Sequence, residues 1–252
     1  MADIKPQVYK DPRPAEQFQR FHEWTRTHRP GWTYGFVRIV MTPLAWFLYR
    51  GRALGTPNVP AHGPFILAPN HFSNMDHFFC GVFLRRKVQF MAKSQLFGNP
   101  VLDYVFRIGG AFPVRRGHHD EEAFITAHSI LDRGGCVCMY CEGGRSRSSH
   151  LGEPRRGVGR LALESGVQVV PVAIHGSSGV RRWKRLRFPR VTIQFGEPLV
   201  FPVVAEPTLE QQLEAARRIF NRVKEMYVVL EAEGRAGAAA RFPMPPSGAH
   251  AP

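Results

Sequence analysis

Short apolar runs alternate with helix-like segments along most of the chain, and this alternation limits the folds that it can adopt. Beyond Pro60, each apolar run is followed by a segment with helical periodicity before the next run begins. Strands that alternate with helices are typical of parallel sheets, because each return to the same edge of the sheet requires a crossover connection. The sequence therefore predicts an α/β fold with a mostly parallel sheet flanked by helices.

The expected elements follow from these patterns. Strands are predicted at residues 65–69, 88–92, 111–114, 136–140, 168–174 and 191–195. Helices are predicted at residues 76–86, 94–107, 120–133, 157–164 and 209–231. The last helix should open with a capping box formed by Thr208 and Gln211.

Three regions are expected along the chain. Residues 1–55 form an N-terminal helical, membrane-associating segment, and residues 56–232 form the α/β domain. Residues 233–252 are rich in Gly, Ala and Pro and are predicted to be a disordered tail.

Residues 33–49 are rich in apolar and aromatic side chains, but Arg38 and Pro43 interrupt them. A membrane-spanning helix needs about 20 consecutive, predominantly apolar residues. We therefore expect an interfacial membrane helix or a broken helical hairpin here. Trp24, Trp32 and Trp46 stand among arginines, which favours the interface of a bilayer over a buried core helix.

The chain is strongly basic. It has 34 Lys and Arg residues against 20 Asp and Glu residues, a net charge of +14 and a pI near 10.4. This balance predicts a polyanionic partner: nucleic acid, an anionic membrane surface or phosphorylated substrates. Residues 181–187 interleave Trp183 with cations. Because no nucleic-acid-binding motif accompanies this run, we expect it to meet anionic lipid headgroups or an acidic acyl carrier, with a solvated loop as the alternative.

The cysteines do not resemble a disulfide framework. Cys136, Cys138 and Cys141 crowd into one apolar run, and Cys80 stands apart. Alternating residues of a strand point to one face, so we expect buried thiols and a reducing compartment. No metal site is expected, because no second pair of ligands lies nearby in the sequence.

Polar residues follow nearly every predicted strand. In open α/β sheets, ligands bind beyond the carboxyl ends of the strands. The residues expected at that edge are Asn70, His71, Lys93, Arg115, Arg116, Glu142, Gly143, Gly144, Arg145, Ser146, His175 and Gly176. The sequence therefore predicts one crevice that holds a base, a carboxylate and several cations.

His71 and Asp76 are the candidate base and its partner. Side chains five positions apart diverge on a continuous helix, so the pair requires a turn between them. Ser73 supplies a helix start, with His71 in the loop before the helix and Asp76 in its first turn. An imidazole beside a carboxylate can take a proton from an alcohol. The alternative is that Asp76 is only a capping acid and His71 only a loop residue.

The arginines of the crevice suit an anion. Their guanidinium groups bind phosphate in a bidentate manner, and backbone amides of the Gly143-Gly144 turn can add donors. We expect Glu142 to brace its loop or to contact a substrate hydroxyl.

Four blocks, in this order, resemble the glycerolipid acyltransferases typified by 1-acylglycerol-3-phosphate acyltransferase. The first block is NHFSNMD at residues 70–76, and the second is GAFPVRRG at residues 110–117. The third is YCEGGRS at residues 140–146, and the last is VPV at residues 170–172. The resemblance covers about residues 40–200. Two positions of the third block depart from the family pattern: Cys141 replaces a proline and Gly144 replaces a threonine.

The resemblance implies a site and a reaction. His71 and Asp76 would be catalytic, and the phosphate of the substrate would be bound by Lys93, Arg116, Glu142, Gly143 and Arg145. The reaction would transfer a fatty acyl group from acyl-CoA or acyl carrier protein to a lysophospholipid. The most fitting acceptor is 1-acylglycerol 3-phosphate, which would give phosphatidic acid. The enzyme would need no cofactor or metal and would lie on anionic lipids at the cytoplasmic face of a membrane, as a peripheral or monotopic protein.

Other functions stay open on the sequence. The acceptor could instead be glycerol 3-phosphate, another lysophospholipid or a glycolipid. A non-catalytic lipid-binding module would use the same cations without consuming thioester. A basic RNA-binding protein would explain the charge but not the ordered blocks, so no nucleic acid is expected. A covalent acyl-enzyme is not indicated, because residues 176–179 lack the spacing of a GxSxG elbow, and no P-loop is present.

Overall fold

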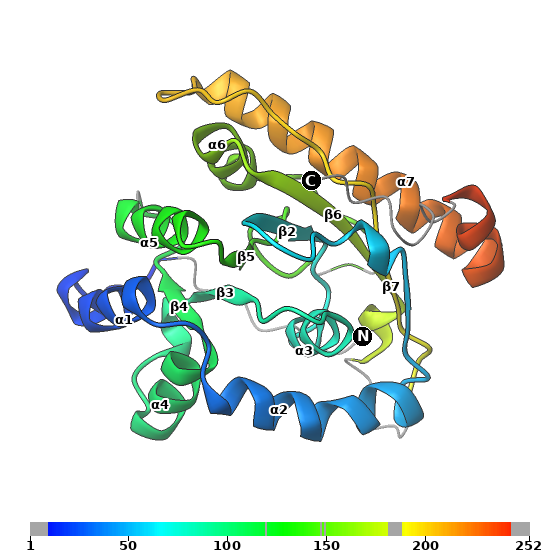
Figure 1. Cartoon of the computed structure of the whole chain (residues 1–252), viewed down its shortest axis with the longest axis horizontal. Coiled ribbons are helices and arrows are strands. Elements are labelled where there is room, and N and C mark those ends of the chain that lie inside the picture. Colours follow the sequence, from blue (N-terminus) through cyan, green and yellow to red (C-terminus); the bar gives the residue numbers. More distant parts are fainter. Residues whose placement is uncertain (1–9, 119, 147, 149, 181–187, 243–252) are drawn as a thin grey trace.

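The computed structural model describes residues 10–118, 120–146, 148, 150–180 and 188–242. Within these residues the chain forms a seven-stranded sheet with strand order β1-β7-β6-β2-β5-β3-β4. Neighbouring strands are parallel except for β6 and β7, which are antiparallel. Helices cover both faces of the sheet (Figure 1). The predicted α/β class with a mostly parallel sheet is confirmed.

The observed elements lie close to the predicted ones. The strands are β1 (Arg52–Leu54), β2 (Phe65–Pro69), β3 (Gln89–Lys93), β4 (Ala111–Val114), β5 (Cys136–Cys138), β6 (Gln168–His175) and β7 (Thr192–Phe195). The α-helices are α1 (Glu16–Thr27), α2 (Trp32–Pro43), α3 (Asp76–Phe83), α4 (Pro100–Gly109), α5 (Glu121–Asp132), α6 (Arg156–Ser165) and α7 (Leu209–Arg241). The sequence pattern did not predict β1, a three-residue strand at the edge of the sheet that is too short to show periodicity.

The helix expected at residues 94–107 is divided into two parts. A short 3₁₀ turn (Ser94–Leu96) ends before Gly98, which has a φ of 134°. The Asn99 side chain then accepts hydrogen bonds from the amides of Val101 and Leu102 and starts α4. Asn99 therefore acts as a helix N-cap with Pro100 at the first helical position, where proline is well tolerated.

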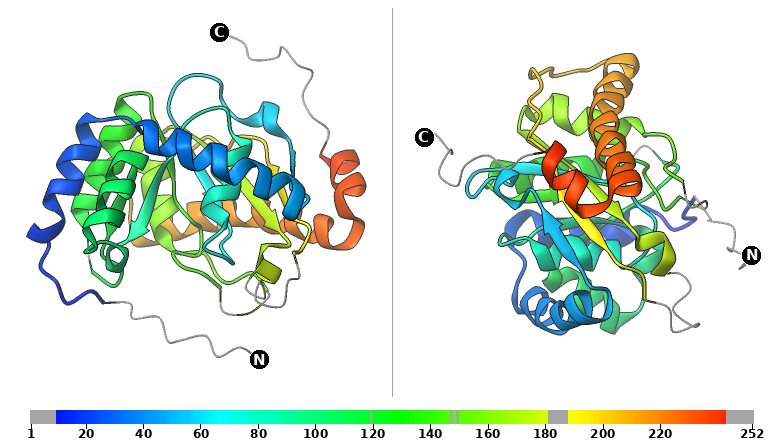
Figure 2. Two further views of the ribbon diagram at one scale, coloured as in Figure 1. Left: turned by 90° about the horizontal axis from the view of Figure 1, so that it is seen from below. Right: turned by 90° about the vertical axis from the view of Figure 1, so that its right-hand side faces the viewer.

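Alternate residues of the central strands build two cores. Ile66 and Ala68 of β2 pack in the core that contains α5, α6 and α7. Phe65 and Leu67 point to the opposite face, into the core that contains α3 and part of α2. This alternation is the period of an extended strand, and because both faces are covered, the strand is apolar throughout. Figure 2 shows α7 and α2 on opposite sides of the sheet.

The four cysteines are buried free thiols. Cys136 and Cys138 lie in the same core, as expected for alternating residues of one strand, whereas Cys141 lies in the other core. Burial raises the pKa of the Cys136 and Cys141 thiols, which keeps them protonated.

Residues 10–55 are largely helical, as expected, but they are integrated into the domain. Helix α1 packs against α5 and β4, and β1 pairs with β7 at the edge of the sheet. The segment expected as a separate membrane-associating unit therefore contributes to the main fold. In the described part of the chain, every helix is too short or too polar to cross a membrane.

Helix α2 breaks where the sequence places Pro43. The helix continues beyond this proline as a π-helical turn (Leu44–Leu48). Proline has no backbone N–H to donate, so the regular hydrogen-bond ladder is interrupted there. The interruption expected at Pro43 is therefore present as a change of helix type, without a hairpin.

Helix α7 is longer than predicted. It begins with the predicted capping box, in which Thr208 Oγ1 accepts from the Gln211 amide and the Gln211 side chain accepts from the Thr208 amide. It bends at Gly234, whose φ is 67°, and continues to Arg241. The prediction of disorder from residue 233 is therefore wrong up to Arg241, because Arg235 binds Thr192 and Ala238 is buried. Residues 243–252 lie outside the described part of the chain.

Candidate active site

The predicted base and carboxylate meet at the carboxyl end of β2. His71 follows β2, Asp76 is the first residue of α3, and the distance from His71 Nδ1 to Asp76 Oδ2 is 2.9 Å. The same oxygen accepts hydrogen bonds from the amides of Phe72 and Ser73, each at 2.8 Å. Asp76 is therefore both the partner of the imidazole and the group that satisfies the turn before α3. The two interpretations of Asp76 drawn from the sequence hold together.

The protonation of His71 follows from this geometry. Because a carboxylate oxygen accepts, Nδ1 carries the proton and Nε2 is left with a lone pair. Burial lowers the pKa of His71 below its usual 6.5, while the hydrogen bond to Asp76 and its charge oppose that shift. The cations Arg116 and Arg145 lower the pKa further. The imidazole is therefore neutral at neutral pH, the state that a general base requires.

The loop after β5 holds His71 from the other side. Glu142 Oε2 accepts from the His71 amide at 3.3 Å, and Oε1 accepts from the Gly152 amide at 2.9 Å. The amide of Ser146 donates to the His71 carbonyl at 2.8 Å. Glu142 thus has the bracing role expected from the sequence, since both carboxylate oxygens face backbone donors. A carboxylate would repel a phosphate, so its place in the predicted phosphate-binding set is as a support for the loop.

An aromatic ring packs on the imidazole. The Tyr140 ring stacks on His71 with centroids 3.8 Å apart and an interplanar angle of 20°. His77 of α3 contacts both rings at an angle. This packing fixes the plane of the imidazole in addition to its hydrogen bond. Sequence reasoning did not assign a role to Tyr140, although its place two residues before Glu142 was a signal.

Asn70, expected in the crevice, has a structural role instead. Its side chain donates to the Ile174 carbonyl at 3.1 Å and accepts from the Ile174 amide at 2.7 Å. These two bonds join the end of β2 to β6. Asn70 therefore locks the backbone from which His71 projects.

Three of the predicted cations gather near His71. Burial lowers the pKa of Lys93, and the charges of Arg145 and Arg116 lower it further, so the three groups lie within electrostatic reach of one another. Lys93 ends β3, Arg116 follows β4 and Arg145 lies in the loop after β5. Clustered cations repel one another, and an anion placed among them would relieve that repulsion.

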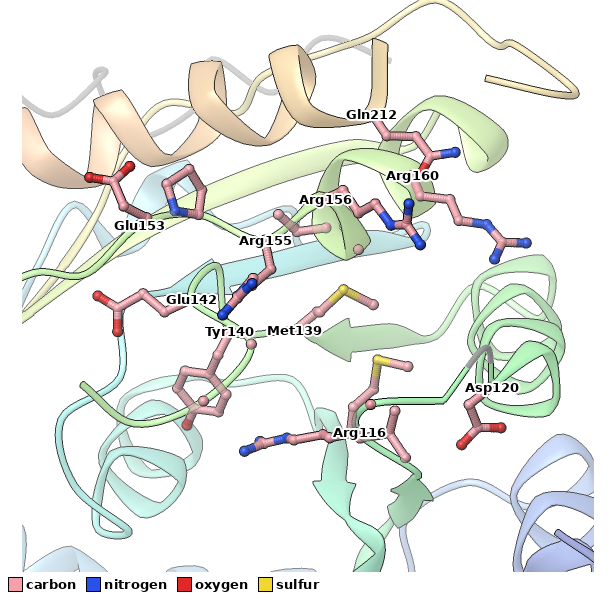
Figure 3. A pocket seen from close by; sticks show the side chains of 18 of the residues that line it. Arg116, Asp120, Met139, Tyr140, Glu142, Glu153, Arg155, Arg156, Arg160 and Gln212 are labelled. Carbon is pink, nitrogen blue, oxygen red and sulfur yellow. The ribbon is translucent and has the colours of Figure 1, made fainter. Parts of the chain in front are cut away.

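A cavity of about 1190 Å³ lies at this edge of the sheet, and Figure 3 shows several of the side chains that line it. Arg116, Glu142, Gly143 and Arg145 belong to its lining, as does Tyr140, behind which His71 is buried. Gly143 has a φ of 64°, the left-handed conformation that glycine adopts readily. Four of the five predicted phosphate-binding residues therefore line one cavity, whereas Lys93 is within electrostatic reach of Arg116 and Arg145 but is not part of the lining.

Two residues expected in the crevice serve elsewhere. The Arg115 guanidinium donates to the Arg13 carbonyl at 2.9 Å and ties the N-terminal segment to the sheet. His175 packs edge-on against Tyr227 of α7, with ring centroids 5.3 Å apart. His175 does not reach the crevice because it is still paired with Thr192 of the antiparallel strand β7.

Metal binding has no support in the described residues, where no three His, Cys, Asp or Glu side chains are grouped in a way that could hold an ion. The basic run at residues 181–187 lies outside the described part of the chain.

Comparisons with known proteins agree with this geometry. The family model for acyltransferases matches residues 52–175, which contain the entire cluster. The 1-acyl-sn-glycerol-3-phosphate acyltransferase of Bacillus subtilis is 29% identical over 172 residues, covering 67% of this chain and 84% of that protein. The chloroplastic 1-acyl-sn-glycerol-3-phosphate acyltransferase of Arabidopsis thaliana is 25% identical over 135 residues, covering 52% of this chain but only 38% of the plant protein.

A solved structure shares the fold. The crystal structure of the 1-acyl-sn-glycerophosphate acyltransferase of Thermotoga maritima superposes with a TM-score of 0.56 at 21% sequence identity. The match covers 84% of this chain and 96% of that chain. The arrangement of sheet and helices is therefore common to both molecules.

Proposed function

Since the chain belongs to the acyltransferase family, we propose that it transfers a fatty acyl group from an acyl thioester to the free hydroxyl of 1-acylglycerol 3-phosphate, which yields phosphatidic acid. One observation carries this proposal. A neutral imidazole, oriented by Asp76 at 2.9 Å, stacks on Tyr140, which lines a single cavity together with Arg116 and Arg145. The acceptor offers the two groups that such a site recognises, a hydroxyl and a phosphate.

The mechanism uses two parts of the site: the base His71 and the cations that bind the phosphate. Nε2 of His71 takes the proton of the acceptor hydroxyl while that oxygen attacks the thioester carbonyl carbon. The tetrahedral intermediate collapses, the carbon–sulfur bond breaks, and the leaving thiolate receives the proton from the imidazolium. Arg116, Arg145 and Lys93 hold the phosphate, which fixes the hydroxyl near the base. Positioned base catalysis of this kind contributes about 10²–10⁴-fold to the rate.

The acyl donor finds apolar contacts in the same cavity. Phe124, Met139, Val158 and Leu213 line it together with the cations. Apolar lining favours a fatty acyl chain or the pantetheine arm of its carrier, because both lose contact with water there. A thioester can thus lie next to a phosphorylated acceptor.

Membrane association is the second part of the proposal. Exposed apolar side chains gather on α2, its π-helical continuation and α4, which packs on α2: Trp32, Phe36, Ile39, Val40, Trp46, Phe47, Val101, Leu102 and Tyr104. A patch of this kind marks a membrane or protein contact. We propose that it docks the enzyme on anionic lipids at the cytoplasmic face of a membrane, where its acceptor and product reside.

The test measures thiol release from long-chain acyl-CoA with 1-acylglycerol 3-phosphate as acceptor. His71→Ala should lower kcat by about 10²–10⁴-fold, whereas His62→Ala, which removes an exposed histidine, should leave it unchanged. Near wild-type turnover by His71→Ala would refute the base assignment.

Acceptor identity is settled by a panel in the same assay. Glycerol 3-phosphate, other lysophospholipids and a glycolipid are compared at equal concentration. A higher kcat/KM with any of these would replace 1-acylglycerol 3-phosphate as the acceptor. Lipid binding without thiol release from any of them would identify a non-catalytic module.

A further inference from the structure

The cavity has a second set of cations that the proposed acceptor clamp does not use. Arg155 and Arg156, at the start of α6, line it together with Arg116 and Arg145. Figure 3 shows Arg155 and Arg156 entering from the α6 side, whereas Arg116 enters from the side of β4. The cations therefore occupy two walls of one space.

The charges of this second pair are not neutralised within the protein. Among the residues that the structure describes, neither guanidinium has an ion pair or a hydrogen bond, and both side chains are exposed. Their neighbour Arg160 is different. It binds both carboxylate oxygens of Glu121, at 2.7 and 2.6 Å, and Glu164 at 2.7 Å. Arg160 is thus a fixed part of the wall, while Arg155 and Arg156 are available to a ligand.

The backbone of Arg155 and the aliphatic part of its side chain both contact the loop after β5. Its amide donates to the Cys141 carbonyl at 2.8 Å, directly before Glu142. A Cβ at position 143 would lie 3.0 Å from the Arg155 Cγ, so the glycine allows the stem to pack closely against the turn. The guanidinium is therefore held beside the loop that braces His71.

The acids that line the same cavity do not compensate this charge. Glu142 accepts from the backbone amides of His71 and Gly152, and Asp120 accepts from those of Arg115 and Ala123. Glu121 is occupied by Arg160. The remaining acid, Glu153, directs its carboxylate away from the Arg155 guanidinium in Figure 3.

We propose that Arg155 and Arg156 form a second anion site that binds the phosphate groups of CoA when acyl-CoA is the acyl donor. The inference rests on the proposed function, in which two substrates with charged heads must occupy one cavity together. Arg156 enters from α6 and Arg116 from the side of β4, so the two charged heads can bind at different places in the cavity, and its apolar lining, which includes Phe124 and Met139, suits the acyl chain. Two guanidinium groups from consecutive residues, which Figure 3 shows pointing in different directions, fit a pyrophosphate and a further phosphate better than the single phosphodiester of a carrier protein.

The test compares the full chain with its double variant Arg155→Ala/Arg156→Ala. We expect the KM for acyl-CoA to rise about tenfold or more, as for the loss of charged hydrogen bonds to phosphate, while the KM for the acceptor changes less than about twofold. Arg155→Lys/Arg156→Lys should recover part of the loss. Lys224→Ala removes an exposed positive charge on α7, outside the cavity lining, and should change neither constant.

Direct binding separates this inference from the proposed function. Isothermal titration calorimetry should show weaker binding of CoA to the double variant, and weaker binding of dephospho-CoA than of CoA to the wild type. If the double variant loses CoA binding and the wild type releases no thiol in the transfer assay, the anion site is supported and the proposed function is refuted. Equal CoA binding by the wild type and the double variant, with transfer intact, would overturn the site.

Two further outcomes would also overturn it. If the KM for the acceptor rises in place of that for acyl-CoA, the pair belongs to the acceptor clamp. If transfer from acyl carrier protein falls as much as transfer from acyl-CoA, the arginines do not recognise the nucleotide part of CoA. A selective loss with acyl-CoA supports the assignment.

Discussion

At the scale of single residues, the site depends on how one carboxylate oxygen is shared. Oδ2 of Asp76 accepts from the imidazole and from two backbone amides, so the acid cannot move without opening the turn before α3. Burial and the nearby arginines lower the pKa of His71, and Asp76 is the group that raises it. The pKa of His71 therefore depends on two opposing effects: burial and nearby positive charges lower it, and the interaction with Asp76 raises it.

This balance predicts the titration of His71. In the free enzyme the imidazole should titrate below its usual 6.5, because the largest effect is burial. Asp76→Asn should lower the midpoint further, since the amide carries no charge to favour the imidazolium. Histidine ring NMR, with the His71→Ala spectrum for assignment, measures both values. A midpoint above 6.5 in the wild type, or an upward shift in Asp76→Asn, would contradict the balance described.

At the scale of elements, the contact between α6 and α7 fixes one wall of the cavity. Gly159 of α6 lies so close to α7 that an added Cβ would be 1.9 Å from the Gln212 carbonyl oxygen. Gln212 and Leu213 also line the cavity, so the helix contact and the cavity share residues. The glycine is required for the close approach of two backbones.

Gly159→Ala should therefore lower the free energy of unfolding by about 2 kcal/mol or more, because α7 must move away. Gly157→Ala in the same helix is the matched control, as its Cβ would meet only Met139 and Phe124 at ordinary distances of 3.6 and 3.7 Å. That change should stabilise the protein by about 0.4–1 kcal/mol. Urea unfolding measures both, and equal effects of the two substitutions would refute the close-contact argument.

At the scale of the whole molecule, the two sides of the sheet differ in character. The side of α2 and α4 exposes large apolar side chains, with Ile39 74% and Phe47 81% exposed, whereas α7 covers the opposite face of the sheet (Figure 2). The proposed membrane contact therefore has a definite side. The molecule would lie on lipid through the N-terminal helices that also build its core.

Substitution of this patch predicts a loss of membrane binding. Ile39→Asp/Phe47→Asp should weaken binding to vesicles of phosphatidylcholine and phosphatidylglycerol by about tenfold or more, since two large apolar groups no longer enter the bilayer. Val228→Asp on α7, an exposed valine on the other side, should bind as the wild type does. Vesicle sedimentation measures the partition. Unchanged binding of the double variant would remove this patch from the membrane contact.

Buried histidines predict how the stability of the whole molecule depends on pH. Burial lowers the pKa of His22, His71, His77 and His175, that of His77 from 6.5 to about 3. Below pH 6.5 the unfolded chain takes up protons that the folded chain excludes, so stability falls as the pH decreases from 7 to 5. His77 alone accounts for roughly 2 kcal/mol at pH 5.

Urea unfolding at pH 7 and pH 5 checks this dependence. His77→Phe, which keeps a ring beside Phe90 and Tyr140, should reduce the difference by roughly that amount. If the free energy of unfolding changes equally between pH 7 and pH 5 in the variant and in the wild type, His77 is not the titrating group.

The sequence alone determined the α/β class, the ends of the central strands and the identity of the chemical groups. These follow from local rules: apolar periodicity, capping residues such as Thr208, and motifs such as residues 70–76 whose members are near one another in the chain. His71 and Asp76 were predicted to meet because the helix start at Ser73 supplies the turn that the pair requires, and the structure places them 2.9 Å apart.

Only the tertiary structure decided which distant groups share the cavity. The stacking of Tyr140 on His71, the bracing by Glu142 and the use of Arg115 to bind Arg13 join residues tens of positions apart. The edge strand β1 exists because β7 offers it a partner, and the helix beyond Gly234 because Arg235 reaches Thr192. Such contacts depend on the packing of the entire sheet, which no local pattern encodes.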